Sequence, residues 1–337
     1  QDTRRYFKDH QARLGCLIST LVDNQTSPTA PSGGAGSGQQ KKKRQKFFDS
    51  KVLVLMALPA FAIYSFLYLY PSISNLWNST KRWDGVTPPE FIGARNFTYL
   101  ATNDDLFLKV VGNNFRFAFV VVVLQTSLSL LFATFLLKNT KTTIFLRVVY
   151  FFPTILSSVS VGLIWLFLYN PNYGLINATG KSIGLMNEPG INWLGDGRFA
   201  LYAIAITQVW FHTGQMVVIY VAGLQQIPAE LYEAAEVDGA SRWQQFKNIT
   251  WPMALPTTAV VVAYTTIQSF RAFDLVYAMT QGGPNNASDV LVTLIYNTAF
   301  ASFKFGYASA QSVLLVVTVL LITWLQRRTL RVNYGDR

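Results

Sequence analysis

Glu233-Ala234-Ala235-Glu236-Val237-Asp238-Gly239-Ala240 is a polar stretch between two long apolar runs of the sequence. The residues before Gly239 favour a helix, and Ser241 to Ile249 can form a second one. Glycine at the end of a helix permits the left-handed turn that other residues avoid. The stretch therefore predicts two short helices joined at an angle, and such a knob suits a groove in a partner protein. The alternative is a connecting loop that happens to be helical.

The composition indicates a membrane protein. Of the 337 residues, 51% are hydrophobic and only 13% are charged, whereas roughly 25% are charged in ordinary soluble domains. The formal net charge of +11 fits either a nucleic acid or a membrane surface as partner. The basic residues sit at the edges of apolar runs instead of clustering with exposed aromatic residues. We therefore expect contact with membrane lipid and none with nucleic acid.

Six apolar runs of roughly 20 residues follow one another, each long enough to cross a bilayer as a helix. They cover residues 52–73, 117–137, 148–169, 199–224, 253–279 and 307–325. The sequence thus predicts an all-α membrane protein with about six transmembrane helices and with the Glu233 loop between the fourth and the fifth. We expect three regions, namely a polar N-terminal extension with a flexible linker (1–50), the membrane domain (51–328) and a C-terminal tail (329–337).

Basic residues gather on alternate connections between these runs. These connections include residues 41–46, 138–147, 242–247 and 327–331, whereas the other connections mix basic with acidic residues. The positive-inside rule places the basic connections in the cytoplasm. Both termini and the Glu233 loop are therefore predicted to be cytoplasmic.

Polar side chains form a stripe along each of two predicted helices. Burying such groups at bilayer depth is costly unless they are paired or face water. Run 199–224 carries Gln208, His212 and Gln215 with Phe211 close by, and run 253–279 carries Thr265, Gln268, Ser269 and Ala272. Amides, hydroxyls and an imidazole near aromatic rings suit a sugar, so these residues form the predicted substrate-binding set. The alternative is that they hydrogen-bond to neighbouring helices.

Several motifs point to one family. Besides residues 233–240, they are Asn170–Asn177, Phe273–Pro284 and Gly306–Ala310. Over roughly residues 51–328 the chain resembles the membrane subunits of ABC importers, in particular the carbohydrate-uptake group of the maltose and glycerol-phosphate type. In that family the EAA loop is a coupling helix that docks on the ATPase subunit. The resemblance implies this role for Glu233, Ala234, Ala235, Asp238, Gly239 and Ala240.

The resemblance also implies an assembly and a location. The chain would be a multi-pass permease in a bacterial inner membrane and one half of a heterodimeric pore. Its implied partners are a second permease subunit, two ATP-binding subunits and an extracytoplasmic sugar-binding protein. ATP and Mg would be held by the ATPase subunits, so we expect no enzymatic activity and no cofactor or metal in this chain. The single cysteine, Cys16, excludes an intrachain disulfide, and His10 and His212 lie too far apart for a short-range metal motif.

The substrate class follows from the charges near the two stripes. In the resembling family the substrate lies between the helix before the coupling loop and the helix before Gly-Gly-Pro, which here are runs 199–224 and 253–279. The stripes hold no Arg or Lys, and Arg271 and Asp274 are expected to have a structural role near the outer end of the second run. A neutral di- or oligosaccharide or glycoside is therefore the expected substrate. The alternatives are an ABC permease for glycerol phosphate and an ion-coupled secondary sugar transporter, which would usually show internal repeats and buried acidic residues.

Overall fold

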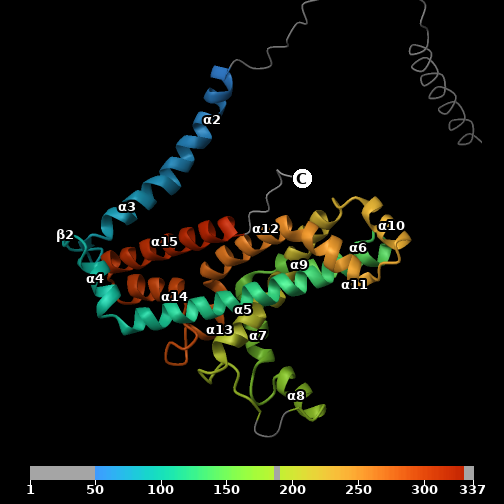
Figure 1. The fold of residues 1–337 in the computed structure, drawn as a ribbon. Coiled ribbons are helices and arrows are strands. Elements are labelled where there is room, and N and C mark those ends of the chain that lie inside the picture. The colour runs from blue at the N-terminus through green and yellow to red at the C-terminus, as the bar shows by residue number, and fades with distance from the viewer. Residues whose placement is uncertain (1–49, 186–189, 330–337) are drawn as a thin grey trace, which may run out of the picture. The chain divides into compact units, whose positions relative to one another are not determined.

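The computed structural model describes residues 50–185 and 190–329, and helices make up most of them (Figure 1). Two short antiparallel strands, β1 (Lys81–Arg82) and β2 (Glu90–Phe91), are the only strands in these ranges. The predicted all-α class is thus confirmed. The predicted N-terminal extension and C-terminal tail lie almost wholly outside the described residues.

The chain divides into two units, residues 1–60 and residues 61–337, and every site described below belongs to the second. The helices are α2 (Ser50–Tyr64), η1 (Ser65–Leu69), α3 (Tyr70–Asn78), α4 (Arg95–Thr102), α5 (Asp105–Phe135), α6 (Lys141–Phe151), η2 (Phe152–Ile155), α7 (Ser158–Leu168), α8 (Leu175–Ser182), α9 (Ala200–Leu224), α10 (Ala229–Val237), α11 (Arg242–Gln245), η3 (Phe246–Thr250), α12 (Trp251–Phe270), α13 (Asp274–Thr280), α14 (Leu291–Tyr296), η4 (Asn297–Ala301) and α15 (Phe305–Thr329).

Four helical segments of the described chain are long and apolar enough to cross a membrane, namely Leu55–Asn78, Asp105–Phe135, Ala200–Leu224 and Phe305–Thr329. A fifth span results if the bent pair Lys141–Ile155 and Ser158–Leu168 is counted as one. The sequence predicts about six membrane spans, and the predicted span that is missing from this count is the one that contains α12. This helix has 20 residues and no charged side chain, but its threonines and its glutamine lower its mean hydropathy.

Two of the predicted continuous runs are broken in the structure. The run 148–169 bends by 98° between η2 and α7, where Leu156 and Ser157 are extended. Pro153 is the second residue of η2, in the first turn of a helix, where a missing N–H is tolerated. The run 253–279 is interrupted between Phe270 and Asp274, so that α12 and α13 are separate helices. Hydropathy does not register the first break because the residues on both sides are similarly apolar, whereas Arg271 and Asp274 flank the second break.

Helix α9 is the centre of the bundle and has the most buried surface of the long helices. It packs chiefly on α5, and also on α12 and α6. The buried Tyr220 hydroxyl donates to Thr258 Oγ1 at 3.2 Å and so ties α9 to α12. At Gly214, a Cβ atom would lie 1.8 Å from the Tyr150 carbonyl oxygen, so only glycine allows α6 to approach this closely. This packing holds the faces of α9 and α12 that form the site.

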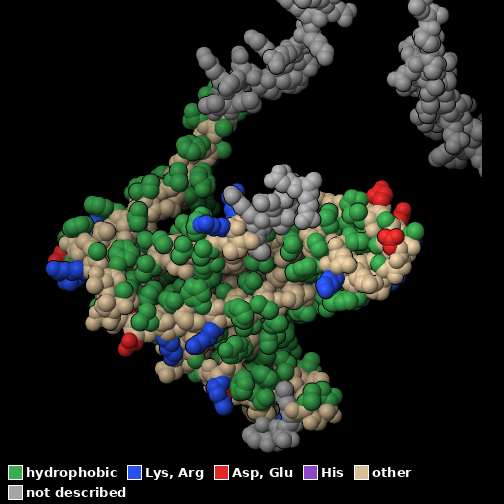
Figure 2. All heavy atoms as spheres, in the orientation of Figure 1, with side chains coloured by type: hydrophobic (Ala, Val, Ile, Leu, Met, Phe, Trp, Pro, Cys, Tyr) green, Lys and Arg blue, Asp and Glu red, His purple; other side chains and the backbone are tan. Residues whose placement is uncertain are grey.

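Hydrophobic side chains cover much of the face of the second unit that Figure 2 shows. Large apolar side chains on α15 are more than half exposed, among them Leu320 at 64% and Val316 at 57%. A soluble protein seldom leaves so much contiguous apolar surface uncovered. The surface therefore fits lipid or another membrane subunit as its surroundings.

Candidate functional site

A cavity of about 580 Å³ lies where α9, α12 and the joint between α12 and α13 meet the start of α7. Its size is typical of a site for a small organic ligand. Its wall consists of Leu156, Ser158, Gln208, Phe211, His212, Tyr264, Ile267, Gln268 and residues 271–275.

Five residues of the predicted substrate-binding set lie together in this wall. They are Gln208, Phe211 and His212 from α9 and Gln268 and Ala272 from α12 and the residues that follow it. The structure therefore brings the two predicted stripes to one cavity. Their binding of a substrate remains a prediction.

The other three predicted residues do not line the cavity. Gln215 Nε2 donates to the Tyr264 hydroxyl at 3.0 Å, so it contacts the wall through Tyr264. Thr265 and Ser269 are fully buried in the bundle, and the Ser269 hydroxyl donates to the Thr265 carbonyl at 2.7 Å. For Ser269, this bond is the local helix contact that the alternative interpretation expects.

Two polar atoms in the wall lack a hydrogen-bond partner among the described residues. They are Nδ1 of His212 and Oε1 of Gln268, and both are shielded from solvent. A buried polar atom without a partner costs about 1–3 kcal/mol. Rotation of these two side chains toward the cavity would let a ligand that offers hydroxyl groups remove this cost, because a hydroxyl can both donate and accept.

Arg271 and Asp274 also line the cavity, which the sequence reasoning missed. Asp274 Oδ2 accepts a hydrogen bond from the Ser158 hydroxyl at 2.9 Å, which links α13 to α7. Helical spacing could have indicated Arg271, since it follows Tyr264 by seven residues and Gln268 by three and thus shares their face. A cation in the wall weakens the argument that the site must suit a neutral substrate.

The Glu233 loop has the predicted helix–glycine–helix form. Helix α10 ends at Val237 with Asp238 as its C-cap, and Gly239 follows with a φ of 74°. The Gly239 N–H donates to the Glu236 carbonyl at 3.1 Å, and the Ala240 N–H donates to the Ala235 carbonyl at 2.8 Å. This pair of bonds is a Schellman motif, in which the residue after the cap must be left-handed. Gly239 therefore sets the bend between α10 and α11.

One face of this loop is fixed to the bundle. The side chains of Tyr232, Phe246 and Ile249 pack against the apolar cluster that α9 and α12 share, and the Tyr232 hydroxyl lies 2.9 Å from Thr250 Oγ1. Motion of α10 would thus be passed to both helices that line the cavity.

The other face of the loop is exposed and acidic. It carries Glu230, Glu233, Glu236 and Asp238, and Figure 2 shows acidic side chains gathered at the α10 end of the molecule. Ala234 is exposed, whereas Ala235 and Ala240 are half-buried, so the predicted coupling residues span the outer face and the hinge. The exposed Val237 and Trp243 add apolar contact area to this acidic surface.

Residues 125–331 match the family described as "Binding-protein-dependent transport system inner membrane component". This region is more than half of the chain, and it contains α9, the Glu233 loop and α12. The chain belongs to this family.

Curated relatives are similar over most of their length. A probable ABC transporter permease of Bacillus subtilis, YurN, is 34% identical over 81% of this chain and 94% of its own. The trehalose/maltose transport system permease MalF of Thermococcus litoralis is 34% identical over 82% of this chain and 93% of its own. The sn-glycerol-3-phosphate transport system permease UgpA of Agrobacterium fabrum is 31% identical over 86% of this chain and 98% of its own.

Solved structures support the same fold. A chain of a bacterial alginate ABC transporter, crystallised with an alginate-bound periplasmic protein, superposes with a TM-score of 0.73 at 21% identity, over 83% of this chain and 94% of that one. Together with its family and its apolar helices, the curated relatives make this chain an integral inner-membrane permease subunit of an ABC transporter. It is a transport subunit and not an enzyme.

Proposed function

We propose that this permease forms half of the translocation pathway of an ATP-driven importer, and that a sugar passes through the cavity between α9 and α12. The observation that carries the proposal is the pair of shielded, unpartnered atoms, His212 Nδ1 and Gln268 Oε1, in one wall with the Phe211 ring. Hydroxyl groups of a sugar satisfy such atoms, while a pyranose face packs on an aromatic ring. Gln208 and Ala272, which also belong to the predicted set, lie in the same wall.

The proposed partners follow from the exposed surfaces and the relatives. A second permease subunit would supply the rest of the pathway, and an extracytoplasmic binding protein would deliver the sugar. Two ATPase subunits, which bind ATP and Mg, would dock on the acidic face of α10. With both termini and α10 in the cytoplasm, closure of the ATPases would move α10 and, through Tyr232 and Phe246, the helices around the cavity.

A neutral di- or oligosaccharide is the preferred substrate, because amides and an imidazole outnumber the single cation of the wall. The relatives include a permease of a trehalose/maltose system and a permease of a diacetylchitobiose uptake system. Arg271 favours a second candidate, a glycerol phosphate, and a relative belongs to an sn-glycerol-3-phosphate system. An arginine in the wall would bind the phosphate group.

The decisive experiment is purification of the intact complex from its native membrane, followed by reconstitution in proteoliposomes. We expect a second permease and an ATPase to co-purify, and uptake of a radiolabelled sugar to require ATP and the binding protein. Trehalose, maltose, a chitobiose and glycerol 3-phosphate are the first substrates to compare. Uptake that follows an ion gradient without ATP would overturn the proposal in favour of a secondary transporter.

A further inference from the structure

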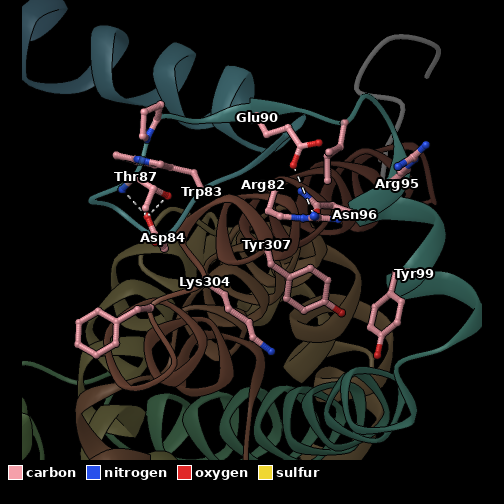
Figure 3. A pocket seen from close by; sticks show the side chains of 13 residues that line it. Arg82, Trp83, Asp84, Thr87, Glu90, Arg95, Asn96, Tyr99, Lys304 and Tyr307 are labelled. Atoms are coloured by element: carbon pink, nitrogen blue, oxygen red, sulfur yellow. Dashed lines mark hydrogen bonds and ion pairs between the residues drawn. The ribbon is translucent and has the colours of Figure 1, made fainter.

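A second cavity of about 580 Å³ lies at the opposite end of α15 from Arg327 and Arg328, against the β1–β2 hairpin and α4 (Figure 3). Three apolar spans meet here. The span Leu55–Asn78 ends just before β1, α5 begins at Asp105 just after α4, and α15 begins at Phe305. Because the cavity lies where apolar spans give way to polar chain, it lies at the level of a membrane surface.

The cavity has a rigid frame. Buried Asn96 donates through Nδ2 to the carbonyls of Ser79 and Lys81, each at 2.9 Å, and so fixes α4 to the end of α3. The Gly306 N–H donates to the Trp83 carbonyl at 3.1 Å and fixes β1 to α15. These bonds hold three segments that are far apart in the sequence around one opening.

Cations and aromatic rings share this opening. Arg95 and Lys304 are exposed, and neither has an acidic partner within residues 50–185 and 190–329. Figure 3 shows Lys304 extending beside the ring of Tyr307. The centroids of the Tyr307 and Tyr99 rings are 5.8 Å apart. Trp83 also lines the opening. Tyrosine and tryptophan with Arg or Lys at this depth are characteristic of contact with lipid head groups.

The two acidic side chains that line the cavity, Asp84 and Glu90, have partners within the protein. Asp84 accepts bonds from the backbone N–H groups of Val86 and Thr87, which hold the pKa of its carboxyl below the ordinary value. Glu90 lies 3.4 Å from Arg82 in an exposed ion pair. Glu90 offsets Arg82, and Arg95 and Lys304 outweigh the ionised Asp84, so the side chains that line the cavity carry a net charge of +1.

The neighbouring surface offers a place for acyl chains. On α3, Leu76 and Trp77 are more than half exposed, and Phe303 at the rim of the cavity is 61% exposed. Phe303 has a φ of 54°, an unfavourable conformation for a non-glycine residue that is typical of functional sites. We propose that this cavity binds the phosphate group of a membrane phospholipid, with Lys304 and Arg95 supplying the charge and the apolar surface of α3 receiving the acyl chains.

Photo-crosslinking in the intact complex tests the identity of the ligand. Replacing Tyr99, which is 53% exposed, with a benzophenone amino acid places the probe at the opening without altering the Asn96 frame. Irradiation in native membranes should yield an adduct with the mass of a phospholipid. An adduct to the binding protein or to the second permease, or no adduct, would overturn the proposal.

A lipid titration tests whether Lys304 and Arg95 contribute to phospholipid binding. Delipidated complex receives dioleoyl phosphatidylglycerol, and native mass spectrometry counts the bound molecules. Each of the variants Lys304→Ala and Arg95→Ala should weaken the tightest binding step about fivefold, since one cation near a lipid surface contributes about that much. Lys141→Ala removes another exposed cation, at the first turn of α6, and serves as the matched control. Equal affinity in all four proteins, or an equal loss in the control, would contradict the assignment.

Discussion

Gly239 shows how one backbone angle shapes a functional element. Its φ of 74° closes the Schellman motif at the end of α10, and a Cβ atom placed there would touch nothing within 4 Å. Any effect of a side chain at this position therefore comes from the backbone alone. A non-glycine residue in the left-handed region costs about 1–2 kcal/mol, and Asn tolerates it better than Ala.

We accordingly expect Gly239→Ala to loosen the α10–α11 knob and to reduce sugar uptake, while Gly239→Asn retains most of it. Hydrogen exchange of the α10 amide groups should rise about fivefold to thirtyfold in the Ala variant, which corresponds to the cost of the turn. Equal exchange in wild type, Ala and Asn variants would show that the turn is not what orders α10.

Gln268 is the residue with which the cavity hypothesis can be tested most directly. Gln268→Leu keeps the volume of the side chain but removes the unpartnered Oε1. We expect apparent affinity for the sugar to fall about threefold to tenfold, as for a lost hydrogen bond, with normal assembly of the complex. Gln208→Leu should act in the same direction.

The matched control is Gln326→Leu on α15, which makes the same replacement in a membrane helix outside the cavity. Gln326 donates to Thr266 Oγ1 at 2.8 Å, so this variant loses a helix–helix bond but no cavity group. Unchanged uptake in both cavity variants would show that Gln208 and Gln268 have a purely structural role.

At the scale of elements, α10 combines a fixed face with an exposed acidic face, which is the arrangement that a coupling helix needs. The charge reversal Glu233→Lys should uncouple ATP hydrolysis from uptake, because a cation would meet the groups that Glu233 is expected to bind. Proteoliposomes with the variant complex should lose most sugar uptake while the protein remains in the membrane. Asp105→Lys reverses an exposed charge at the start of α5 and should leave coupling intact. Normal transport by the Glu233→Lys variant would show that the loop only connects α9 to α12 and does not couple ATP hydrolysis to uptake.

The sequence predicts this element well because its signals are local. A helix-forming stretch, a glycine and a Ser241 cap with Gln244 three residues later are all read within one short segment and indicate α10 and α11. The breaks in runs 148–169 and 253–279 have weaker local signals and depend on tertiary contacts. For the same reason the sequence does not tell which side of α12 faces the cavity. Apolar and small polar side chains of α12 itself are distributed around its whole circumference. From the sequence alone, Thr265 and Ser269 are therefore as plausible as Tyr264 and Arg271 as residues that face the cavity.

At the scale of the whole molecule, the positive charges and the spans must agree on one topology. By the positive-inside rule, the basic residues at both the Glu233 loop and the end of α15 predict a cytoplasmic location for these segments. The loops at Tyr173 and Ser302 then lie outside. This arrangement requires that α9 crosses the membrane and that the chain from α12 to α14 crosses back, although α12 is less apolar than the four clear spans.

Cysteine labelling decides whether α12 spans the membrane. The only native cysteine, Cys16, is first replaced by Ser, and single cysteines are then introduced as Tyr173→Cys, Asp238→Cys and Ser302→Cys at exposed positions. A membrane-impermeant maleimide applied to intact spheroplasts should label the first and third variants and should label Asp238→Cys only after lysis. Labelling of Ser302→Cys only after lysis would mean that α12 to α14 re-enter without crossing. The start of α15 would then lie in the cytoplasm, and the predicted inner location of the C-terminus would be wrong as well.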